Sequence, residues 1–341
     1  MSKTAYLFPG QGSQEVGMGR ALYEQLPEAR ARLDRADELL GFALTDLMFG
    51  EGSSDDEDEE EALKQTDVTQ PALFAHSLAV MAVLEAQDAR PAPDMTAGHS
   101  LGEYSALAAA GALSFEDGLR VVRRRGQLMA AVGSSSDEGG ADEGGGDGGA
   151  RAGTMAAVIG MENDALAAVC EDVTRQGGSG DGGYVVQPAN FNAPGQVVIS
   201  GDVEAVEATM RLCEERGARR AIRLPVSGAF HSPLMQDARD GLAEVLADLE
   251  IRAPRCPVYL NVTAEATTEP EAIRAALLEQ LLSPVRWAAS LRAMHESGGA
   301  ERFVEVGAGR VLSGLVRRTL GRDVTVAQVG TADDLAGAQS A

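Results

Sequence analysis

The chain has 341 residues and a formal net charge of −23, from 52 acidic and 29 basic side chains. This length is enough for one large domain or two ordinary ones. The strong negative charge argues against nucleic acid or an anionic membrane as a partner. Lysine occurs only at Lys3 and Lys64, whereas arginine is common. This acidic, lysine-poor composition favours a halophile-like surface, where salt screens the repulsion between like charges.

The chain lacks a membrane-span pattern, a signal-peptide pattern and closely spaced cysteines, which limits where the protein is expected to act. It contains no run of 18 apolar residues, so we expect no membrane span. The first residues, 1–6, do not have the basic-then-apolar layout of a signal peptide. The three cysteines (Cys170, Cys213 and Cys256) are far apart, which predicts reduced thiols and no zinc site. We therefore expect a cytoplasmic protein.

The chain begins with a predicted buried strand, Thr4–Phe8, followed by the glycine-containing loop Pro9–Gln14 and a helix from about Met18. A glycine loop between a strand and a helix start can hold an anion or an oxyanion, although an ordinary tight turn has the same pattern. No Gly-Lys-Ser/Thr follows, which excludes a phosphate-binding loop. The acidic run Glu51–Glu61 is predicted to be a solvated loop.

A nucleophile elbow is predicted around Ser100. Residues Gly98–Gly102 read Gly-x-Ser-x-Gly, between the short apolar run Met95–Ala97 and the helix-forming run Tyr104–Ala110. This is the strand–turn–helix setting that exposes a nucleophilic serine. The five-residue pattern alone is loose and can arise by chance in a glycine-rich chain. Before it, apolar residues at helical spacing predict a long helix over Thr69–Gln87, with Thr69 as its cap.

Three consecutive arginines (Arg123, Arg124 and Arg125) lie in the predicted helix Ser114–Val132. Three successive positions cannot share one helix face, so at least one must point away from the others. An arginine that faces inward needs an anion, whereas three solvated arginines are the alternative. The following stretch, Gly133–Gly149, is rich in glycine, serine and acidic residues, which predicts a disordered loop.

Residues 151–224 have a different pattern, which predicts a small ferredoxin-like subdomain of order β-α-β-β-α-β. The predicted elements are, in order, Thr154–Ile159, Asn163–Arg175, Tyr184–Gln187, Gln196–Ser200, Val203–Arg216 and Arg219–Leu224. The fold class is α/β: a large, α/β-hydrolase-like domain made of residues 1–132 and 225–341, with the acidic, Gly-rich disordered loop 133–150 and the small subdomain set into it.

His231 is the best candidate base for Ser100. It stands on a loop that enters a helix predicted from about Pro233 to Leu249, where a side chain can reach a neighbouring serine. The other three histidines are poorer candidates. His76 lies within the long helix, the side chain of His99 should point away from that of Ser100, and His295 lies late on a polar helix.

The last part of the chain continues the alternation of strands and helices. The predicted elements are the strand Val258–Asn261, the helices Pro270–Leu282 and Trp287–Glu296, the strand Phe303–Val306 and a helix that ends at Leu320. Gly307 and Gly309 follow the last of these strands, as in a dinucleotide-binding turn. The third glycine of that motif is missing, because Leu312 stands there, so we do not expect a dinucleotide site.

Six segments in a fixed order resemble the malonyl-CoA:acyl-carrier-protein transacylase family, which belongs with the acyltransferase domains of polyketide synthases. They cover nearly the whole chain, and are Phe8–Gln14, Gly98–Tyr104, Arg125–Gly126, Ala189–Gln196, Gly228–Ser232 and Phe303–Gly307. One of these motifs would be weak evidence, whereas six in order are strong. The two acidic segments depart from the family pattern but touch none of the motifs.

The resemblance implies a catalytic dyad in place of a triad. Ser100 resembles the nucleophile that is acylated, and His231 resembles its general base. In this family a backbone carbonyl orients the histidine, and here it should be that of Gln280. The backbone amides of Gln11 and Leu101 would form the oxyanion hole.

The resemblance also implies four substrate-binding residues. Arg125 would bind the malonyl carboxylate, since the planar guanidinium matches a carboxylate with two parallel hydrogen bonds. Asn190 and Asn192 fall in the matching segment of the small subdomain. Phe230 resembles the residue that limits bulk on the α-carbon of the substrate, which favours malonyl over methylmalonyl; ordinary packing is the alternative.

The reaction that the resemblance implies is a ping-pong transfer of malonyl from malonyl-CoA to the phosphopantetheine thiol of acyl carrier protein, in fatty acid synthesis. The resemblance also implies a monomer that needs no metal or redox cofactor. A discrete polyketide loading enzyme, a serine thioesterase or hydrolase, and a non-enzymatic carrier-docking subunit are the alternatives. An acidic enzyme should repel an acidic carrier protein, unless salt screens the charges or a local basic patch makes the contact. The candidates for that patch are Arg219, Arg220 and Arg223.

Overall fold

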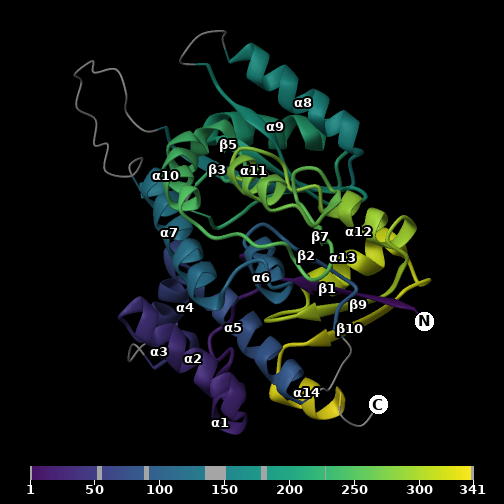
Figure 1. Ribbon diagram of the computed structural model, residues 1–341. Helices are drawn as coiled ribbons and strands as arrows, with labels where there is room; N and C mark the ends of the chain where they lie inside the picture. Colours follow the sequence, from purple (N-terminus) through teal and green to yellow (C-terminus); the bar gives the residue numbers. More distant parts are fainter. Residues whose placement is uncertain are drawn as a thin grey trace.

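The computed structural model describes residues 2–51, 56–87, 92–134, 151–177, 183–226 and 228–338. It has a mixed α/β architecture with two separate sheets (Figure 1), as the sequence predicts. The strands of the larger sheet are β1 (Lys3–Phe8), β2 (Met95–Gly98), β7 (Val258–Tyr259), β8 (Ala266–Thr267), β9 (Ala300–Val306) and β10 (Thr325–Val329).

The larger sheet has the strand order β10-β9-β1-β2-β7-β8. All its pairings are parallel except the antiparallel pair of β7 and β8. The central strand β1 is buried on both faces, because successive side chains of a strand point to opposite sides. Tyr6 and Phe8 belong to the main core on one face, and Ala5 and Leu7 to a second core on the other.

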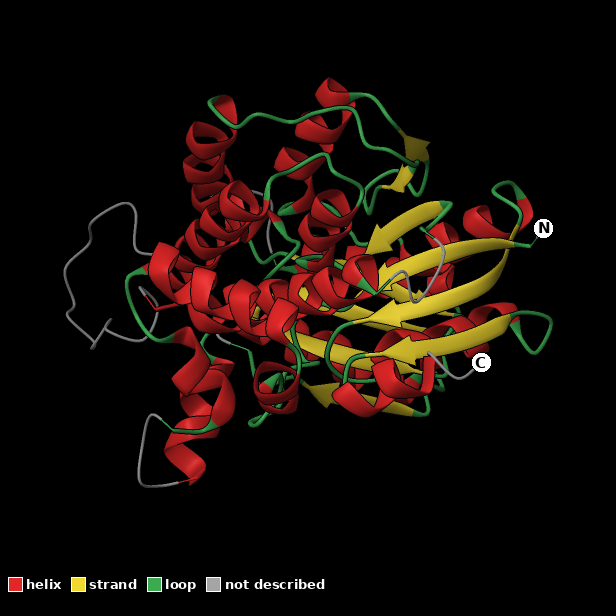
Figure 2. Ribbon diagram, turned by 60° about the horizontal axis from the view of Figure 1, so that its bottom comes forward, coloured by secondary structure: helices red, strands yellow, loops and turns green. Residues whose placement is uncertain are grey.

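Helices cover both faces of this sheet (Figure 2). The second core contains residues of α12 and α13, whereas the main core draws on most of the remaining helices. The helices of the larger unit are α1 (Arg20–Gln25), α2 (Pro27–Leu40), α3 (Leu44–Phe49), α4 (Asp56–Lys64), α5 (Thr66–Ala86), α6 (Gly102–Ala109), α7 (Phe115–Ser134), α10 (Gln236–Ala247), α11 (Pro270–Gln280), α12 (Trp287–Glu296), α13 (Val311–Leu320) and α14 (Ala332–Ala338), with a short 3₁₀ turn at Pro233–Met235.

The second sheet is antiparallel, with the strand order β4-β5-β3-β6. Its elements follow one another as β3 (Gly153–Ile159), α8 (Asn163–Gln176), β4 (Val186–Ala193), β5 (Gln196–Asp202), α9 (Val203–Glu215) and β6 (Arg220–Arg223). This is the β-α-β-β-α-β order that the sequence predicts. A third core joins the sheet to α8 and α9, where both cysteines of this unit, Cys170 and Cys213, are buried.

Three predictions about elements are wrong. Thr69 does not cap the long helix, because α5 begins at Thr66 and Thr69 lies inside it, with its hydroxyl donating to the Leu63 carbonyl. The acidic run Glu51–Glu61 is not a loop throughout, because α4 begins at Asp56. Leu63 of α4 is buried, and Lys64 forms an ion pair of 2.8 Å with Glu60 one turn earlier, which supports a helix. The strand predicted at Tyr184–Gln187 is β4, which begins later and runs to Ala193 because it pairs with β5 along that length.

The predicted disordered loop Gly133–Gly149 lies almost entirely outside the described residues. The described part differs from the prediction, since α7 continues through Gly133 and Ser134. Helix α5 is long and apolar enough to cross a membrane by length and composition, but 89% of the window that meets this criterion is buried inside the protein. It is the central helix of the main core.

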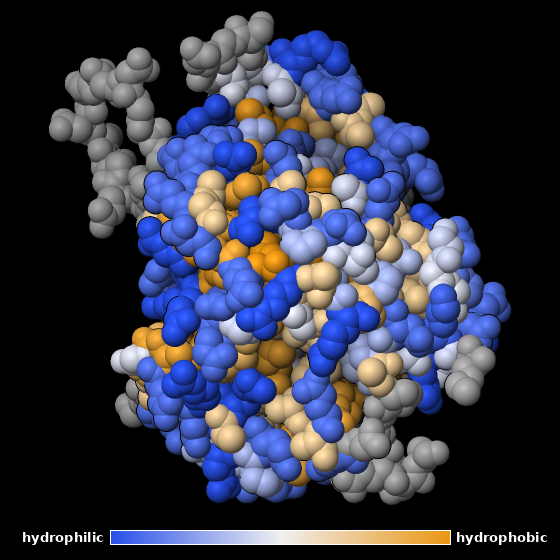
Figure 3. Space-filling model, viewed as in Figure 1, coloured by the Kyte–Doolittle hydropathy of each residue, from blue (hydrophilic) through white to orange (hydrophobic). Residues whose placement is uncertain are grey.

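The surface seen in Figure 3 is mainly hydrophilic, with hydrophobic residues gathered towards the middle of that face. Large hydrophobic residues that are exposed in the described part of the chain are few: Val16, Tyr184, Ile222 and Val311. The high content of acidic residues is therefore carried largely on the outside of an ordinary apolar core.

Candidate active site

Ser100 stands on a strained turn between β2 and α6, as the elbow motif predicts. Its φ is 51°, a left-handed value that non-glycine residues adopt rarely and mostly at functional sites. Gly102 allows the close packing of this turn, since a Cβ there would lie 2.1 Å from the carbonyl oxygen of Phe8. The Ser100 N–H donates to Asn261 Oδ1 at 2.7 Å, and the Asn261 side-chain amide donates to the Gly98 carbonyl at 2.7 Å. The turn that follows β7 therefore holds the elbow in place.

His231 lies in contact with the serine, and the hydrogen bonds define its tautomer. Ser100 Oγ is 2.8 Å from His231 Nε2, and His231 Nδ1 is 2.7 Å from the backbone carbonyl oxygen of Gln280. A carbonyl only accepts hydrogen bonds, so Nδ1 carries the proton and Nε2 is free to accept the serine hydroxyl. A backbone carbonyl thus stands where a carboxylate orients the histidine in a triad.

The environment of His231 keeps its imidazole neutral. The side chain is 3% exposed. Burial lowers the pKa of His231 to about 3, and the positive charge of Arg125 lowers it further than the hydrogen bond to Gln280 raises it. A neutral imidazole can act as a general base without first losing a proton.

The pH dependence of acylation should reflect this lowered pKa. We expect the kcat/KM for acyl loading to show no acid limb near pH 6.5, because protonation of His231 in the free protein requires a much lower pH. In Arg125→Ala, removal of the positive charge should raise the pKa of His231 and move the limb to higher pH. Loading from acetyl-CoA between pH 4.5 and 8 measures both profiles. An acid limb near pH 6.5 in the parent protein, or a limb at lower pH in Arg125→Ala than in the parent, would contradict this account of the pKa of His231.

Arg125 is buried beside the serine with only neutral hydrogen-bond partners. The residue is 1% exposed. Its Nη1 donates to Gln70 Oε1 at 2.8 Å, and its Nη2 donates to Ser100 Oγ at 3.1 Å and to Gln280 Oε1 at 2.9 Å. Its Nε has no partner, and none of the ion pairs among the described residues includes it. A buried charge without a directly paired anion is unfavourable, so this place suits an incoming carboxylate.

Two further side chains surround Arg125. Its guanidinium lies 5.6 Å from the ring centroid of Tyr104, as in a cation–π contact. Glu103 is completely buried, but one of its carboxylate oxygens accepts from the Asn261 N–H at 2.7 Å. Burial raises the pKa of Glu103 to about 7, although the charge of Arg125 acts in the opposite direction. Glu103 is thus a buried carboxyl group that supports the elbow and does not occupy the fork of Arg125.

The two predicted oxyanion-hole residues lie on neighbouring loops. Gln11 follows β1, and Leu101 follows Ser100. The two loops pack closely, since a Cβ on Gly10 would lie 2.3 Å from the carbonyl oxygen of His99. Among the described residues, neither the Gln11 N–H nor the Leu101 N–H donates to a protein acceptor. Both amides are therefore available to an oxyanion at this place.

Strand β4 of the smaller sheet contributes Asn190 and Asn192. Asn192 Oδ1 is 2.7 Å from His99 Nε2, so the side chain of His99 turns towards β4 and not towards its neighbour Ser100, as predicted. Asn190 is 6% exposed and forms an isolated parallel bridge with Val285. The smaller sheet therefore contacts the elbow, through Asn192 and His99.

The structure also gives the places of Phe230, of the three consecutive arginines and of the two histidines outside the site. Phe230, next to the base, is 5% exposed and belongs to the main core. Of the three arginines, Arg125 points inward, Arg124 is exposed, and Arg123 forms an ion pair of 2.9 Å with Asp67. His76 is buried in α5, and His295 donates to the Ala300 carbonyl at 2.7 Å, so neither belongs to the site.

Sequence reasoning missed three side chains that support the site, namely Gln70, Asn261 and Gln187. Gln70 carried a usable signal, because it is a polar residue within the apolar helix α5, and a buried amide requires a partner. Asn261 ends the predicted strand Val258–Asn261, and Gln187 lies on a half-buried strand. Nothing in their local sequence indicates which distant groups they contact.

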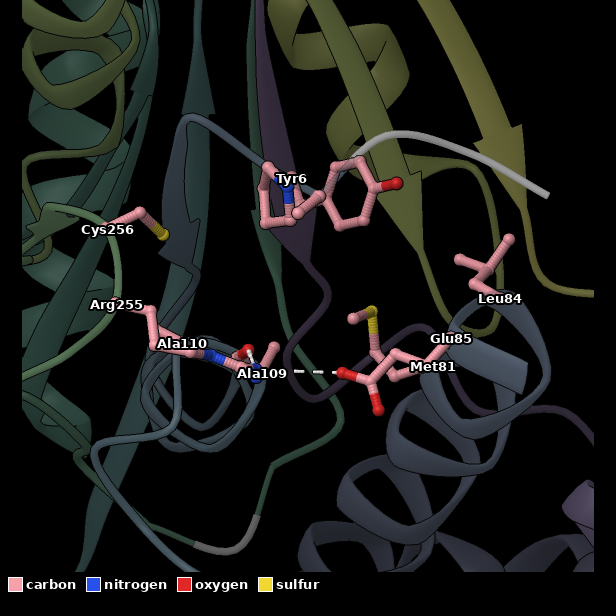
Figure 4. Close-up of a pocket in the computed structure, with 10 residues that line it drawn as sticks. Tyr6, Met81, Leu84, Glu85, Ala109, Ala110, Arg255 and Cys256 are labelled. Carbon is pink, nitrogen blue, oxygen red and sulfur yellow. Dashed lines mark hydrogen bonds and ion pairs between the residues drawn. The ribbon is translucent and has the colours of Figure 1, made fainter. Parts of the chain in front are cut away.

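A cavity of about 450 Å³ lies beside β1, with Tyr6 among the residues that line it (Figure 4). It is lined by residues that precede β2 and β7, such as Pro93 and Cys256, and by the ends of α5 and α6. Ser100 follows β2, so the cavity and the dyad lie at opposite ends of the same strand. Its size alone therefore does not make it the reaction site.

Comparison with known proteins places the chain among acyltransferases. The acyl transferase domain family matches residues 5–181 and 150–336. The malonyl CoA-acyl carrier protein transacylase of Bacillus subtilis (strain 168) is 45% identical over 327 residues, which cover 96% of this chain and 93% of that protein. The corresponding protein of Staphylococcus aureus (strain MRSA252) is 39% identical over 99% of this chain and 98% of its own length.

Solved structures show the same likeness over the whole chain. The acyl carrier protein S-malonyltransferase of Vibrio cholerae O1 biovar eltor has 41% identity and a TM-score of 0.85, covering 98% of this chain and 99% of that one. A malonyl-transacylase in complex with a type II PKS acyl-carrier protein has 37% identity and a TM-score of 0.85, covering 99% of both. The chain therefore belongs to the acyl transferase family, and within it to the malonyl CoA-acyl carrier protein transacylases.

Proposed function

We propose that this protein transfers the malonyl group from malonyl-CoA to the phosphopantetheine thiol of acyl carrier protein, through a malonyl ester of Ser100. The observation that carries the proposal is the buried guanidinium of Arg125, which lacks a directly paired anion and lies 3.1 Å from Ser100 Oγ. A malonyl carboxylate bound there supplies the missing anion and brings the thioester carbonyl to the nucleophile. An acetyl group leaves the guanidinium unpaired, so the same residue discriminates between the two.

In the first half-reaction, His231 Nε2 takes the proton of the Ser100 hydroxyl while Oγ attacks the thioester carbonyl. The oxyanion that forms accepts hydrogen bonds from the Gln11 and Leu101 amides. The C–S bond then breaks, the CoA sulfur leaves with the proton from His231, and a malonyl-serine ester remains. Gln280 keeps the imidazole in the tautomer that this sequence of steps requires.

The second half-reaction reverses these roles. His231 takes the proton of the phosphopantetheine thiol, and the sulfur attacks the ester carbonyl. The Oγ–C bond breaks, and His231 returns its proton to Ser100. Water must be excluded from the ester between the two halves, or the protein would act as a hydrolase. Asn190 and Asn192 on β4 are proposed as substrate-binding residues, because they lie in the segment that resembles the family and the Asn192 side chain contacts His99 next to the nucleophile.

Intact-protein mass after mixing with malonyl-CoA alone tests the proposal. The parent protein should gain one malonyl group, and Ser100→Ala should gain none, because the ester requires Oγ. Ser105→Ala is a matched control: this serine is buried on the next turn of α6, at 1% exposure, and its variant should still be acylated.

The other outcomes point to the rival functions. Free malonate accumulating without an adduct would indicate a hydrolase. The absence of both adduct and turnover would indicate a carrier-docking subunit. An adduct that persists in Ser100→Ala would place the nucleophile elsewhere.

The carrier protein should contact β6 and the loop before it. Arg219 and Arg220 are exposed, and Arg223 forms an exposed ion pair of 3.5 Å with Glu207 and donates to Thr154 Oγ1 at 3.3 Å. We expect the double variant Arg219→Glu/Arg220→Glu to raise the KM for carrier protein about tenfold at low salt, with little change in the KM for malonyl-CoA. Steady-state kinetics at two salt concentrations measure this. Equal effects on both substrates would contradict a local docking patch.

The pathway is the one point where a second candidate has its own support. Fatty acid synthesis is the proposed setting, and the relatives are named as transacylases that act on acyl carrier protein. The complex of a similar transacylase with a type II PKS acyl-carrier protein favours a polyketide carrier as an alternative acceptor. Competition between the two carriers for one malonylated preparation would separate them by their kcat/KM values.

The finer description of the fold is also a proposal. We assign residues 151–224 to a ferredoxin-like subdomain and residues 1–132 and 225–341 to an α/β-hydrolase-like one, with the site between them. The antiparallel strand order β4-β5-β3-β6 and the elbow at the end of β2 support this division. The proposed working state is a cytoplasmic monomer.

A further inference from the structure

Gln187 lies on β4 of the smaller sheet and contacts the catalytic base from behind. Its side-chain amide Nε2 donates to the carbonyl oxygen of His231 at 2.8 Å and to that of Leu282 at 3.1 Å. An amide group has two N–H bonds, so one side chain satisfies both carbonyls. Gln187 therefore links the backbone of the base to the segment that follows α11.

That segment carries the group that orients His231. Gln280, whose carbonyl oxygen accepts from His231 Nδ1 at 2.7 Å, is two residues before Leu282. Further along the chain, at Val285, backbone hydrogen bonds join this segment to the outer edge of β4. The Val285 N–H donates to Ala189 at 2.8 Å, and the Phe191 N–H donates to Val285 at 2.9 Å. Strand β4 is the end strand of its sheet, so this edge is free to accept the added segment.

The backbone of His231 needs such support. Its φ is 59°, a left-handed conformation that persists in a non-glycine residue only when its surroundings hold it. A rotation of this residue would move Nε2 away from Ser100 Oγ and Nδ1 away from the Gln280 carbonyl. Gln187 bonds to the carbonyl of His231 and to that of Leu282 at once. It therefore restricts the distance between the base and the segment that follows Gln280.

We propose that Gln187 is a positioning residue for the general base, through which the smaller sheet holds His231 and the segment following Gln280 in their reactive arrangement. It touches neither the reacting atoms nor Arg125, so it acts on the rate and not on the choice of acyl group. Asn190 and Asn192 lie on the same strand, so the proposed substrate-binding residues and the support of the base share one element, β4. This inference rests on the proposed role of His231.

The test is the kinetics of acyl loading by Gln187→Leu, which keeps the size of the side chain and removes both N–H donors. We expect kcat for malonyl loading to fall about tenfold to a hundredfold, the range in which small misplacements of catalytic groups act. The KM for malonyl-CoA and the ratio of malonyl to acetyl loading should stay within about twofold of the parent values. Gln176→Leu is the matched control, since Gln176 is exposed at the end of α8 in the same sheet unit.

A double variant separates positioning from general stability. In a His231→Ala background, Gln187→Leu should cause no further loss of the residual loading rate, because the group on which it acts is absent. Rates are normalised to the fraction of folded protein. Gln187→Asn, which keeps the donors on a shorter side chain, provides a second variant and should lose less than Gln187→Leu.

An unchanged kcat in Gln187→Leu, together with an inactive His231→Ala, would overturn the positioning role and leave the proposed function intact. A further loss in the double variant, or an altered malonyl-to-acetyl ratio, would also overturn it. If His231→Ala itself kept full activity, the proposed function would fail first.

Discussion

Replacement of His231 by alanine should reduce the rate of Ser100 malonylation by about 10² to 10⁴, the range that general-base catalysis contributes. The hydroxyl of Ser100 would lose the acceptor 2.8 Å away, and a serine hydroxyl is a weak nucleophile without an adjacent base. Binding should change little, because the carboxylate is held by Arg125. Single-turnover mass measurements with saturating malonyl-CoA give this rate directly.

His295→Ala is the control for this experiment. His295 lies on α12 and donates to the Ala300 carbonyl, away from the dyad, so its variant should load malonyl at the parent rate. A His231→Ala protein that loads at the parent rate would show that another group activates Ser100. Loss of loading in both variants would point to unfolding, which thermal denaturation of each variant would reveal.

Replacement of Arg125 by alanine should reverse the choice of acyl group. The kcat/KM for malonyl-CoA should fall about a hundredfold to a thousandfold, since removing one partner of a buried charge pair costs about 3 to 4 kcal/mol. Acetyl loading should be retained or rise, because the variant no longer leaves a buried guanidinium unpaired beside a neutral acyl group. Competition between malonyl-CoA and acetyl-CoA, read from the masses of the two adducts, measures the selectivity.

Arg124→Ala is the matched control, because Arg124 is the preceding residue of the same helix and is exposed. It should leave both loading rates unchanged. Arg125→Lys should recover only part of the malonyl selectivity, since an ammonium offers a point charge in place of a planar fork. Equal losses of malonyl and acetyl loading in Arg125→Ala would mean that this arginine supports the structure of the site and does not select the acyl group.

The supporting residues explain why the site is built from both sheets. Asn261, just after β7 of the larger sheet, bonds to the backbone of Ser100, and Gln187 on the smaller sheet contacts the backbone of His231. Gln280 contacts three members of the site, through its carbonyl to His231 and through its side chain to Arg125 and the Ser100 carbonyl. A change in the relative position of the two sheets would therefore alter the distance between Ser100 and His231.

Local patterns predicted most of the elements, because period-2 and period-3.6 spacing reflect which faces are buried. They failed at α4, where a run of acidic residues looks like a loop until Leu63 finds a place in the core. They also misplaced β4, whose register depends on its partner β5. In both cases the deciding contact comes from a distant part of the chain.

By itself the sequence determined the nucleophile elbow, the candidate base and the requirement that one of three consecutive arginines differ from the others, since each depends on local geometry. Only the tertiary structure decided the rest. It turned Arg125 inward, brought the Gln280 carbonyl to His231, and placed Gln70 and Gln187 as supports. Every residue has a backbone carbonyl, and a glutamine can bond to many groups, so even where the sequence indicates a buried amide, as at Gln70, its partner is decided only when distant segments pack together.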